Sequence, residues 1–176
     1  MEKKKNIVLI GFMGTGKTTV GKILAKKLGM NFVDVDELIE KTAGLKISAV
    51  FAKLGEAYFR DIETEIIKSI TKDSSQVIAT GGGAVLRDEN LNALKSNGVV
   101  FCLTASEELI FDRIKDNNER PLLQVENPKE KIRELLAKRM PRYMMADFII
   151  NTDGLTQEEV SEKIIKEYER IVNGKN

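Results

Sequence analysis

Histidine and cysteine, the side chains behind much enzyme chemistry, are almost missing from this sequence. Its 176 residues include no histidine and one cysteine, Cys102, which lies inside the apolar run 99–103. Such a run is typical of a buried strand. Histidine-based catalysis and a cysteine–histidine nucleophile pair are therefore excluded, and a zinc site is disfavoured, which leaves carboxylates, lysine and magnesium as chemical tools. A single cysteine also favours a reducing, cytoplasmic compartment.

Charge of one sign and long apolar segments are also lacking. The chain has 28 Lys and Arg residues against 27 Asp and Glu residues, so its net charge of +1 predicts neither a nucleic acid nor an anionic membrane as partner. No apolar stretch approaches the ~18 residues of a membrane span. Basic residues before Ile7 imitate a secretory signal, but no small-residue cleavage site follows, and we interpret the apolar run as a first strand. We expect one domain over residues 1–176.

The most specific motif is a glycine-rich loop, GFMGTGKTTVG, at residues 11–21. The positions that match G-x-x-x-x-G-K-[ST] are Gly11, Gly16, Lys17 and Thr18. A β-branched run at 6–10 precedes the loop, and apolar residues recur afterwards at helical spacing until Gly29, a typical helix end. Strand, loop and helix thus follow in the order that a phosphate-binding loop requires. A plain strand-to-helix turn is the alternative.

In such a loop, successive backbone N–H groups turn inward onto phosphate oxygens, and the helix N-terminus adds partial positive charge. Lys17 would reach the outer phosphates, and the Thr18 hydroxyl would ligate magnesium. We therefore predict a site for ATP and Mg²⁺. Its residues would be Gly14, Thr15, Gly16, Lys17, Thr18 and Thr19.

Short apolar runs alternate with helical patterns along the whole chain. The five runs are 6–10, 31–35, 76–80, 99–103 and 148–150. Between them we expect short helices over 36–42 and 47–53 and a longer amphipathic helix over 58–70. This alternation predicts an α/β fold in which a parallel sheet is sandwiched between helices.

Capping signals predict where later helices begin. Thr104 with Glu107, and likewise Thr156 with Glu159, fit the capping box. The pair Asn127-Pro128 combines a capping side chain with proline at the first helical position. The segment before it, residues 116–126, is polar and long for a plain connection. We interpret that segment as a candidate lid, with a disordered surface loop as the alternative.

Ligands of open α/β sheets bind outside the carboxyl ends of the strands, where this sequence places two carboxylates. Asp34 and Asp36 are two residues apart at the end of the second apolar run, so both would point to the same side of a strand. One carboxylate could serve a metal and the other a phosphate acceptor. The alternative is that Asp36 only caps the next helix while Asp34 is solvated.

Glycines and arginines supply further candidates for the acceptor side. The third apolar run leads into Gly81, Gly82 and Gly83, which permit a close approach of backbone to a ligand but also suit a flexible turn. A guanidinium group forms a bidentate fork with a planar carboxylate, so Arg60 and Arg139 are candidates for binding an acidic acceptor. Taken singly, each arginine would more often be a surface residue.

Together these segments resemble the shikimate kinase family, small P-loop kinases that transfer the γ-phosphate of ATP to the 3-hydroxyl of shikimate. The resemblance extends over nearly the whole chain, with order and spacing in agreement. It is carried by GFMGTGKTT at 11–19, FVDVD at 32–36, GEAYFRDIE at 55–63, TGGG at 80–83, RPLL at 120–123, RMPRY at 139–143 and Ala146-Asp147. It implies a three-layer α/β/α sandwich of the P-loop kinase fold, with five parallel strands in the order 2-3-1-4-5.

The resemblance implies an acceptor region at about residues 34–62. Asp36 would bind the acceptor hydroxyl and take its proton, Arg60 and Arg139 would bind the carboxylate, and the ring would lie on the backbone of Gly82 and Gly83. These assignments imply a kinase whose substrates are ATP and shikimate, and we expect a monomer.

The resemblance also assigns residues on the ATP side. Thr18 would ligate Mg²⁺ directly and Asp34 through water. Arg120, in a lid at about 115–127, would close on the phosphates, and Arg113 would lie against adenine. Lys17, Asp36 and Arg120 would then be the catalytic residues. The loop 151–156 lacks the proline or arginine that family members often place against adenine.

Other acceptors and other classes remain as alternatives. Gluconate-type and nucleoside monophosphate kinases share the loop and the general fold. An acceptor without a carboxylate would, however, leave Arg60 and Arg139 unpaired in a closed site, which is costly. A guanine-nucleotide switch is disfavoured because neither N-K-x-D nor D-x-x-G occurs. An inactive relative would be expected to lack Lys17, Asp36 or Arg120, and all three are present.

Overall fold

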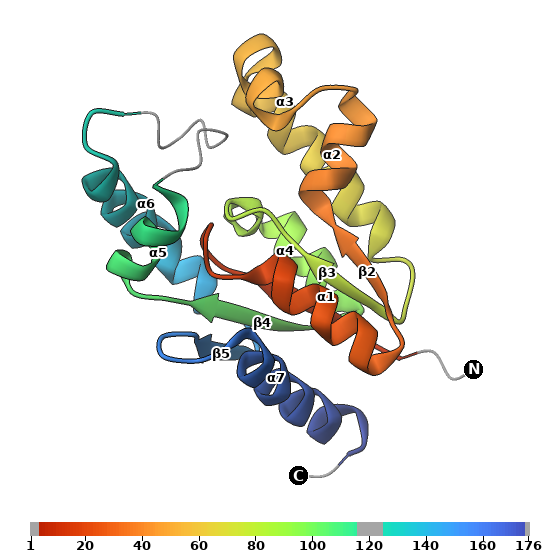
Figure 1. The fold of residues 1–176 in the computed structure, drawn as a ribbon. Coiled ribbons are helices and arrows are strands. Elements are labelled where there is room, and N and C mark those ends of the chain that lie inside the picture. Colours follow the sequence, from red (N-terminus) through yellow and green to blue (C-terminus); the bar gives the residue numbers. More distant parts are fainter. Residues whose placement is uncertain (1–3, 116–124, 175–176) are drawn as a thin grey trace.

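The core of the fold is a five-stranded parallel sheet. The structure, a computed structural model, describes residues 4–115 and 125–174. The strands are β1 (Asn6–Ile10), β2 (Asn31–Asp34), β3 (Gln76–Ala79), β4 (Gly98–Thr104) and β5 (Phe148–Asn151). They lie in the order β2-β3-β1-β4-β5, and every neighbouring pair is parallel (Figure 1). The predicted order 2-3-1-4-5 is therefore confirmed.

Helices cover both faces of the sheet and complete the predicted three-layer sandwich. One face is covered by α1 (Lys17–Leu28) and α7 (Gln157–Val172). The other face is covered by α2 (Val35–Ala43), α3 (Ile47–Ile70), the short 3₁₀-helix η1 (Ala84–Leu86), α4 (Asp88–Ser96), α5 (Glu107–Ile114) and α6 (Pro128–Tyr143). In Figure 1, α2 and α3 rise on one side of the β1–α1 loop and α5 and α6 on the other.

Strand β1 shows how one apolar run supplies two cores. Ile7 and Leu9 belong to the core under α1 and α7, whereas Val8 and Ile10 belong to the core on the opposite face. All four side chains are fully buried. A strand in the middle of a parallel sheet is covered on both faces, so its sequence is continuously apolar and does not alternate.

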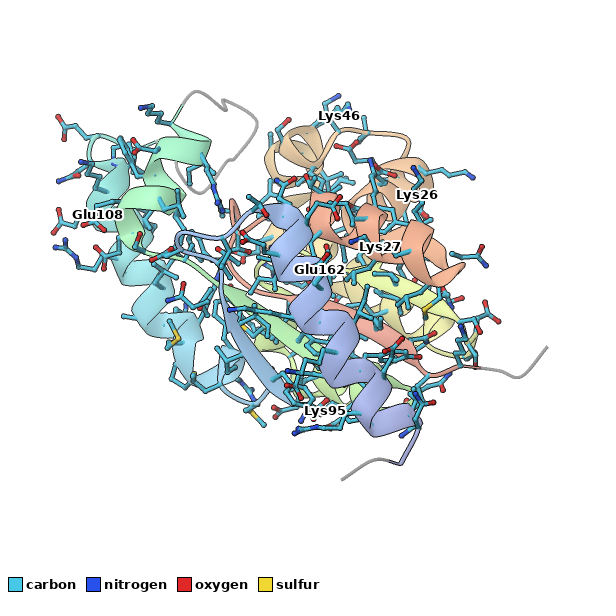
Figure 2. All side chains as sticks on the ribbon, turned by 60° about the horizontal axis from the view of Figure 1, so that its bottom comes forward. Lys26, Lys27, Lys46, Lys95, Glu108 and Glu162 are labelled. Carbon is cyan, nitrogen blue, oxygen red and sulfur yellow. The ribbon has the colours of Figure 1, made fainter. Side chains whose placement is uncertain are left out.

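Helix α7 is attached to α1 at the protein surface as well as through the core. The ammonium group of Lys27 on α1 lies 2.7 Å from a carboxylate oxygen of Glu158 and 3.6 Å from one of Glu162 (Figure 2). Exposed ion pairs of this kind contribute little each. The capping box of Thr156 and Glu159 is formed at the start of the helix, as predicted. The predicted cap of α6, Asn127, is also confirmed, because its side chain accepts the N–H of Glu130.

Two local predictions were wrong. Strand β2 ends at Asp34, and Asp36 lies in the first turn of α2, because the Asp34 carboxylate accepts the N–H groups of Asp36 and Glu37 and starts the helix at once. The argument that both acids point to one side of a strand therefore fails. Helix α5 is capped by the Ser106 hydroxyl, which accepts the N–H of Leu109, and not by Thr104, which ends β4.

The two helices expected on either side of residue 55 are present. They form the two halves of α3 (Ile47–Ile70), which are separated by a kink at Gly55, where φ is 84° and ψ is 167°. In the ranges 4–115 and 125–174, no helix is long and apolar enough to cross a membrane. The proposed lid, with Arg120, falls mostly on residues 116–124, which lie outside the described residues.

Candidate active site

The glycine-rich loop joins β1 to α1 at the carboxyl edge of the sheet. Gly16 is the N-cap of α1 and has φ 92°, a left-handed conformation that glycine adopts without strain. Lys17 begins α1, and its ammonium group donates hydrogen bonds of 2.8 Å to the carbonyls of Gly11 and Phe12. The Thr15 hydroxyl donates to the same Phe12 carbonyl at 2.8 Å. These bonds close the loop into a compact turn around the lysine.

A cavity of about 180 Å³ lies over this loop. It is lined by Met13, Gly14, Gly16, Lys17, Thr18, Thr19, Asp34, Asp36, Thr80, Gly81 and Gly82. Of the loop residues predicted to bind ATP, only Thr15 is not in this lining, since it is buried beneath. Arg113, near the end of α5, donates to the Gly14 carbonyl at 2.9 Å. The arginine predicted to lie against adenine is thereby placed next to the phosphate-binding loop.

Asp34 links the loop to the second strand. One of its carboxylate oxygens accepts the N–H groups of Asp36 and Glu37, at 3.0 and 3.3 Å. The other accepts the Thr18 hydroxyl at 3.0 Å. Both oxygens are thus oriented, and the two residues predicted to serve the metal lie side by side. Asp36, in the first turn of α2, lines the cavity over the loop and the neighbouring larger cavity.

The glycines after β3 lie where a side chain would have little room. A Cβ atom on Gly82 would be 3.1 Å from a terminal nitrogen of Arg139 and 3.4 Å from the backbone nitrogen of Met13. A Cβ atom on Gly83 would be 2.8 Å from the central guanidinium carbon of Arg60. Two arginines therefore approach the backbone of this loop closely, and a methyl group at either glycine would require the neighbouring arginine to shift.

Arg60 is a buried arginine of α3, with 8% of its surface exposed. Its guanidinium group donates to a Glu63 oxygen at 2.8 Å and lies 3.4 Å from an oxygen of Glu56. The Glu63 side chain is fully buried. Burial raises the pKa of the Glu63 carboxyl, and the charge of Arg60 opposes that shift. Within the described part of the chain, the second Glu63 oxygen, Oε1, has no hydrogen-bond partner.

Arg139 and Tyr143 lie one turn apart on α6 and are 3% and 1% exposed. The Arg139 guanidinium carbon lies 5.5 Å from the centre of the Phe12 ring, within cation–π range. The Tyr143 hydroxyl donates to the Gly82 carbonyl at 2.6 Å. Burial raises the pKa of the Tyr143 phenol, and the neighbouring Arg139 charge partly opposes this. The phenol is therefore a neutral hydrogen-bond donor near pH 7.

The larger cavity, of about 390 Å³, collects these groups. Its polar lining includes Asp36, Arg60, Glu63, Gly81, Gly82, Gly83 and Arg139, and its apolar lining includes Ile47, Phe51 and Phe59 of α3. The residues that line both cavities are Met13, Thr18, Asp34, Asp36, Gly81 and Gly82. A phosphate-binding loop thus opens into a pocket that holds two buried guanidinium groups, with Asp36 at the junction.

Sequence reasoning gave no role to Glu63 and Met13, which line this pocket, or to Tyr143, which bonds to its Gly82 carbonyl. Glu63 lies three residues after Arg60, a spacing that brings side chains together on a helix, so the pattern contained the signal. Tyr143 lies four residues after Arg139, which is the same kind of signal. Met13 reaches the pocket through the path of the loop backbone, for which the sequence has no such signal.

The fold and the site define a P-loop kinase, since a phosphate-binding loop opens directly into a second polar pocket at the carboxyl edge of a 2-3-1-4-5 sheet. The family model for shikimate kinase matches residues 13–169 of this chain. The chain belongs to the shikimate kinase family, as its motifs predicted.

Individual relatives agree with this assignment. A shikimate kinase from Thermodesulfovibrio yellowstonii is 69% identical over 171 residues, which cover 97% of this chain and 99% of that protein. One from Thermoanaerobacter pseudethanolicus is 48% identical over 97% of this chain and 99% of its own length. Among solved structures, shikimate kinase from Acinetobacter baumannii in complex with shikimate has a TM-score of 0.92 and 41% identity, covering 98% of this chain and 95% of its own. A gluconokinase from Sinorhizobium meliloti, at 15% identity and TM-score 0.63, shares the fold.

Proposed function

We propose that this chain transfers the γ-phosphate of ATP to the 3-hydroxyl of shikimate, giving shikimate 3-phosphate and ADP in the route to chorismate and the aromatic amino acids. The observation that carries the proposal is the pocket that places Arg60 and Arg139 beside the phosphate-binding loop, with Asp36 between. Two buried guanidinium groups suit an acceptor with a carboxylate, which shikimate has and a nucleoside monophosphate lacks.

In the proposed reaction, the acceptor hydroxyl oxygen attacks the γ-phosphorus as the bond to the β–γ bridging oxygen breaks. The transition state is loose, so most of the rate comes from alignment and from stabilising charge spread over the phosphoryl oxygens. Lys17 would supply part of that positive charge. Asp36 would orient the hydroxyl and take its proton late, since a carboxylate is the natural candidate for this step in a chain without histidine.

The residues also fit a magnesium ion. Thr18 and Asp34 offer a hydroxyl and a carboxylate oxygen 3.0 Å apart, and oxygen is the ligand atom that Mg²⁺ prefers. Among the residues with described positions, no group of three or more His, Cys, Asp or Glu side chains could hold a metal ion alone. Magnesium in kinases keeps water and phosphate oxygens as ligands, so a small protein contribution is expected. When bound, it would neutralise phosphate charge.

The lid role of Arg120, at a position outside the described residues, remains part of the proposal. So do a cytoplasmic location, which the single cysteine favours, and a monomeric state.

The test is ADP release with Mg-ATP against a panel of shikimate, quinate, gluconate and nucleoside monophosphates, with the product identified by mass. We expect rapid turnover that depends on shikimate and yields a product with one added phosphate. Turnover on a nucleoside monophosphate alone would preserve the kinase and overturn the roles of Arg60 and Arg139, whereas turnover on quinate or gluconate alone would keep those roles and overturn shikimate as the acceptor. Bound ATP without turnover on any acceptor would indicate a nucleotide-binding protein without transferase activity.

A further inference from the structure

Gly82 occupies the wall between the ATP side and the acceptor side of the site. It lines both cavities. A Cβ atom at this position would be 3.4 Å from the Met13 backbone nitrogen, 3.6 Å from the Gly11 carbonyl oxygen and 3.1 Å from an Arg139 nitrogen. A small displacement of this glycine would therefore alter its fit to the phosphate-binding loop and to the acceptor arginine.

A side chain distant in sequence holds this glycine. The Tyr143 hydroxyl donates to the Gly82 carbonyl at 2.6 Å across a separation of 61 residues. Other bonds of the glycine segment are local, such as Ala84 N–H to the Gly81 carbonyl at 3.2 Å and Leu86 N–H to the Gly83 carbonyl at 3.1 Å. Local bonds shape the turn, whereas the tyrosine bond fixes its place against α6.

Tyr143 shares its helix face with Arg139, one turn earlier, and both side chains are buried. Helix α6 thus presents a guanidinium group and a hydroxyl to the same glycine. The hydroxyl binds the Gly82 carbonyl, so it sets the distance between the loop backbone and the guanidinium group.

We propose that Tyr143 is a positioning residue for the acceptor carboxylate. Its hydroxyl holds the Gly82 carbonyl so that the glycine backbone and Arg139 form one surface of fixed spacing. The inference rests on the proposed roles of Gly82 and Arg139 in the acceptor pocket. It adds to the site a residue that acts through Gly82 and need not contact either substrate.

The direct test is Tyr143→Phe, which removes one oxygen and keeps the ring in the core. A buried carbonyl that loses its donor is destabilised, and the loop is then free to shift. We expect the KM for shikimate to rise about tenfold, the KM for ATP to change less than about twofold, and kcat to fall less than the shikimate KM rises. An unchanged shikimate KM, or an equal rise in both KM values, would overturn the proposal.

Tyr168→Phe is the matched control. Tyr168 is also buried, at 2% exposure, and its hydroxyl donates to the Lys5 carbonyl at the same distance of 2.6 Å, next to the start of β1. Both variants lose a tyrosine-to-carbonyl bond, so both should lower the melting temperature. Only Tyr143→Phe should raise the shikimate KM. A similar change of KM in both variants would indicate a general loss of stability and sink the positioning role.

Two non-natural residues keep the test decisive if the phenylalanine variant folds poorly. At position 143, 4-aminophenylalanine keeps a donor, whereas 4-fluorophenylalanine fills the volume without donating. The amino variant should retain a shikimate KM near that of the natural protein, and the fluoro variant should not. Equal KM values for the two would contradict the proposal.

Arg139→Lys, assayed in parallel, separates this inference from the proposed site. A raised shikimate KM for Arg139→Lys with no change for Tyr143→Phe would overturn the inference alone. No change for either variant would overturn the carboxylate site as well.

Discussion

The ATP side and the acceptor side of this site are assembled in different ways. The ATP side is built mainly from one stretch, residues 11–19, which passes from β1 into α1. The acceptor side gathers Asp36 from α2, Arg60 from α3, the glycines after β3 and Arg139 from α6. The ATP side therefore depends on local backbone geometry, whereas the acceptor side depends on how four segments pack. A substitution on one side should therefore change the kinetic constants for one substrate more than those for the other.

The largest expected effect is at the junction, in Asp36→Asn. The amide cannot take the hydroxyl proton, so we expect kcat to fall about 10³-fold, with ATP still bound at near normal affinity. ADP release gives kcat, and titration with ATP gives Kd. Asp88→Asn is the control, because this acid of α4 is exposed and pairs with Arg142. Substantial turnover in Asp36→Asn would rule out an essential base and leave Asp36 as a positioning group.

Arg139→Lys should affect the acceptor side alone. An ammonium group cannot reproduce the bidentate fork, so the KM for shikimate should rise about 10- to 100-fold, while the KM for ATP stays nearly constant. Initial rates with each substrate varied in turn give the comparison. Arg142→Lys, on the same helix but facing Asp88, should leave both KM values unchanged. Equal effects of Arg139→Lys on both substrates would contradict the assignment of Arg139 to the acceptor.

Gly83→Ala should produce a smaller effect on the same side. The backbone at Gly83 has φ −101°, which alanine adopts freely, so the cost comes from the new methyl group against the Arg60 guanidinium. We expect a rise of about threefold to tenfold in the shikimate KM, since Arg60 must shift.

Gly29→Ala is the control for Gly83→Ala. Gly29 has φ 63° and no atom within 4 Å of a built Cβ atom, so alanine there strains the backbone without touching the site. It should cost about 1 kcal/mol in the free energy of unfolding and leave both KM values unchanged. A shikimate KM that responds to Gly29→Ala but not to Gly83→Ala would refute the steric argument.

The smallest expected effect is on the rate at which a thiol reagent labels Cys102, which lies in the sheet beneath the ATP side. Burial in β4 raises the pKa of its thiol to about 12, so only about one thiol in ten thousand is ionised at pH 8. Labelling by a thiol reagent should be slow in the native protein, rise with pH and become fast in denaturant. ATP should slow it more than shikimate does. Rapid labelling of the native protein at pH 8 would show that this strand opens readily.

The same contrast explains what could be predicted from the sequence. The five strands and the phosphate-binding loop follow from apolar runs and a contiguous motif, because both are local. The start of α2 was misplaced because the Asp34 side chain caps the helix within the predicted strand, and a capping bond outweighs strand preference. Ser106 replaced Thr104 as the cap of α5 because β4 extends through Thr104.

Prediction was weaker on the acceptor side. Arg60 and Arg139 looked individually like surface residues, and only the resemblance of the whole motif set placed them together. Their burial follows from contacts between α3, α6 and the glycine loop, which are separated by tens of residues in the sequence. The partnership of Gly82 with Tyr143 is a contact of this kind, and no short pattern describes it.

The wall shared by the two cavities has a thermodynamic consequence. Thr18, Asp36 and Gly82 line both cavities. A ligand that orders these residues from one cavity therefore lowers the entropy cost of binding a ligand in the other. The two binding equilibria are then linked. The factor by which a nucleotide changes the affinity for shikimate must equal the factor by which shikimate changes the affinity for that nucleotide.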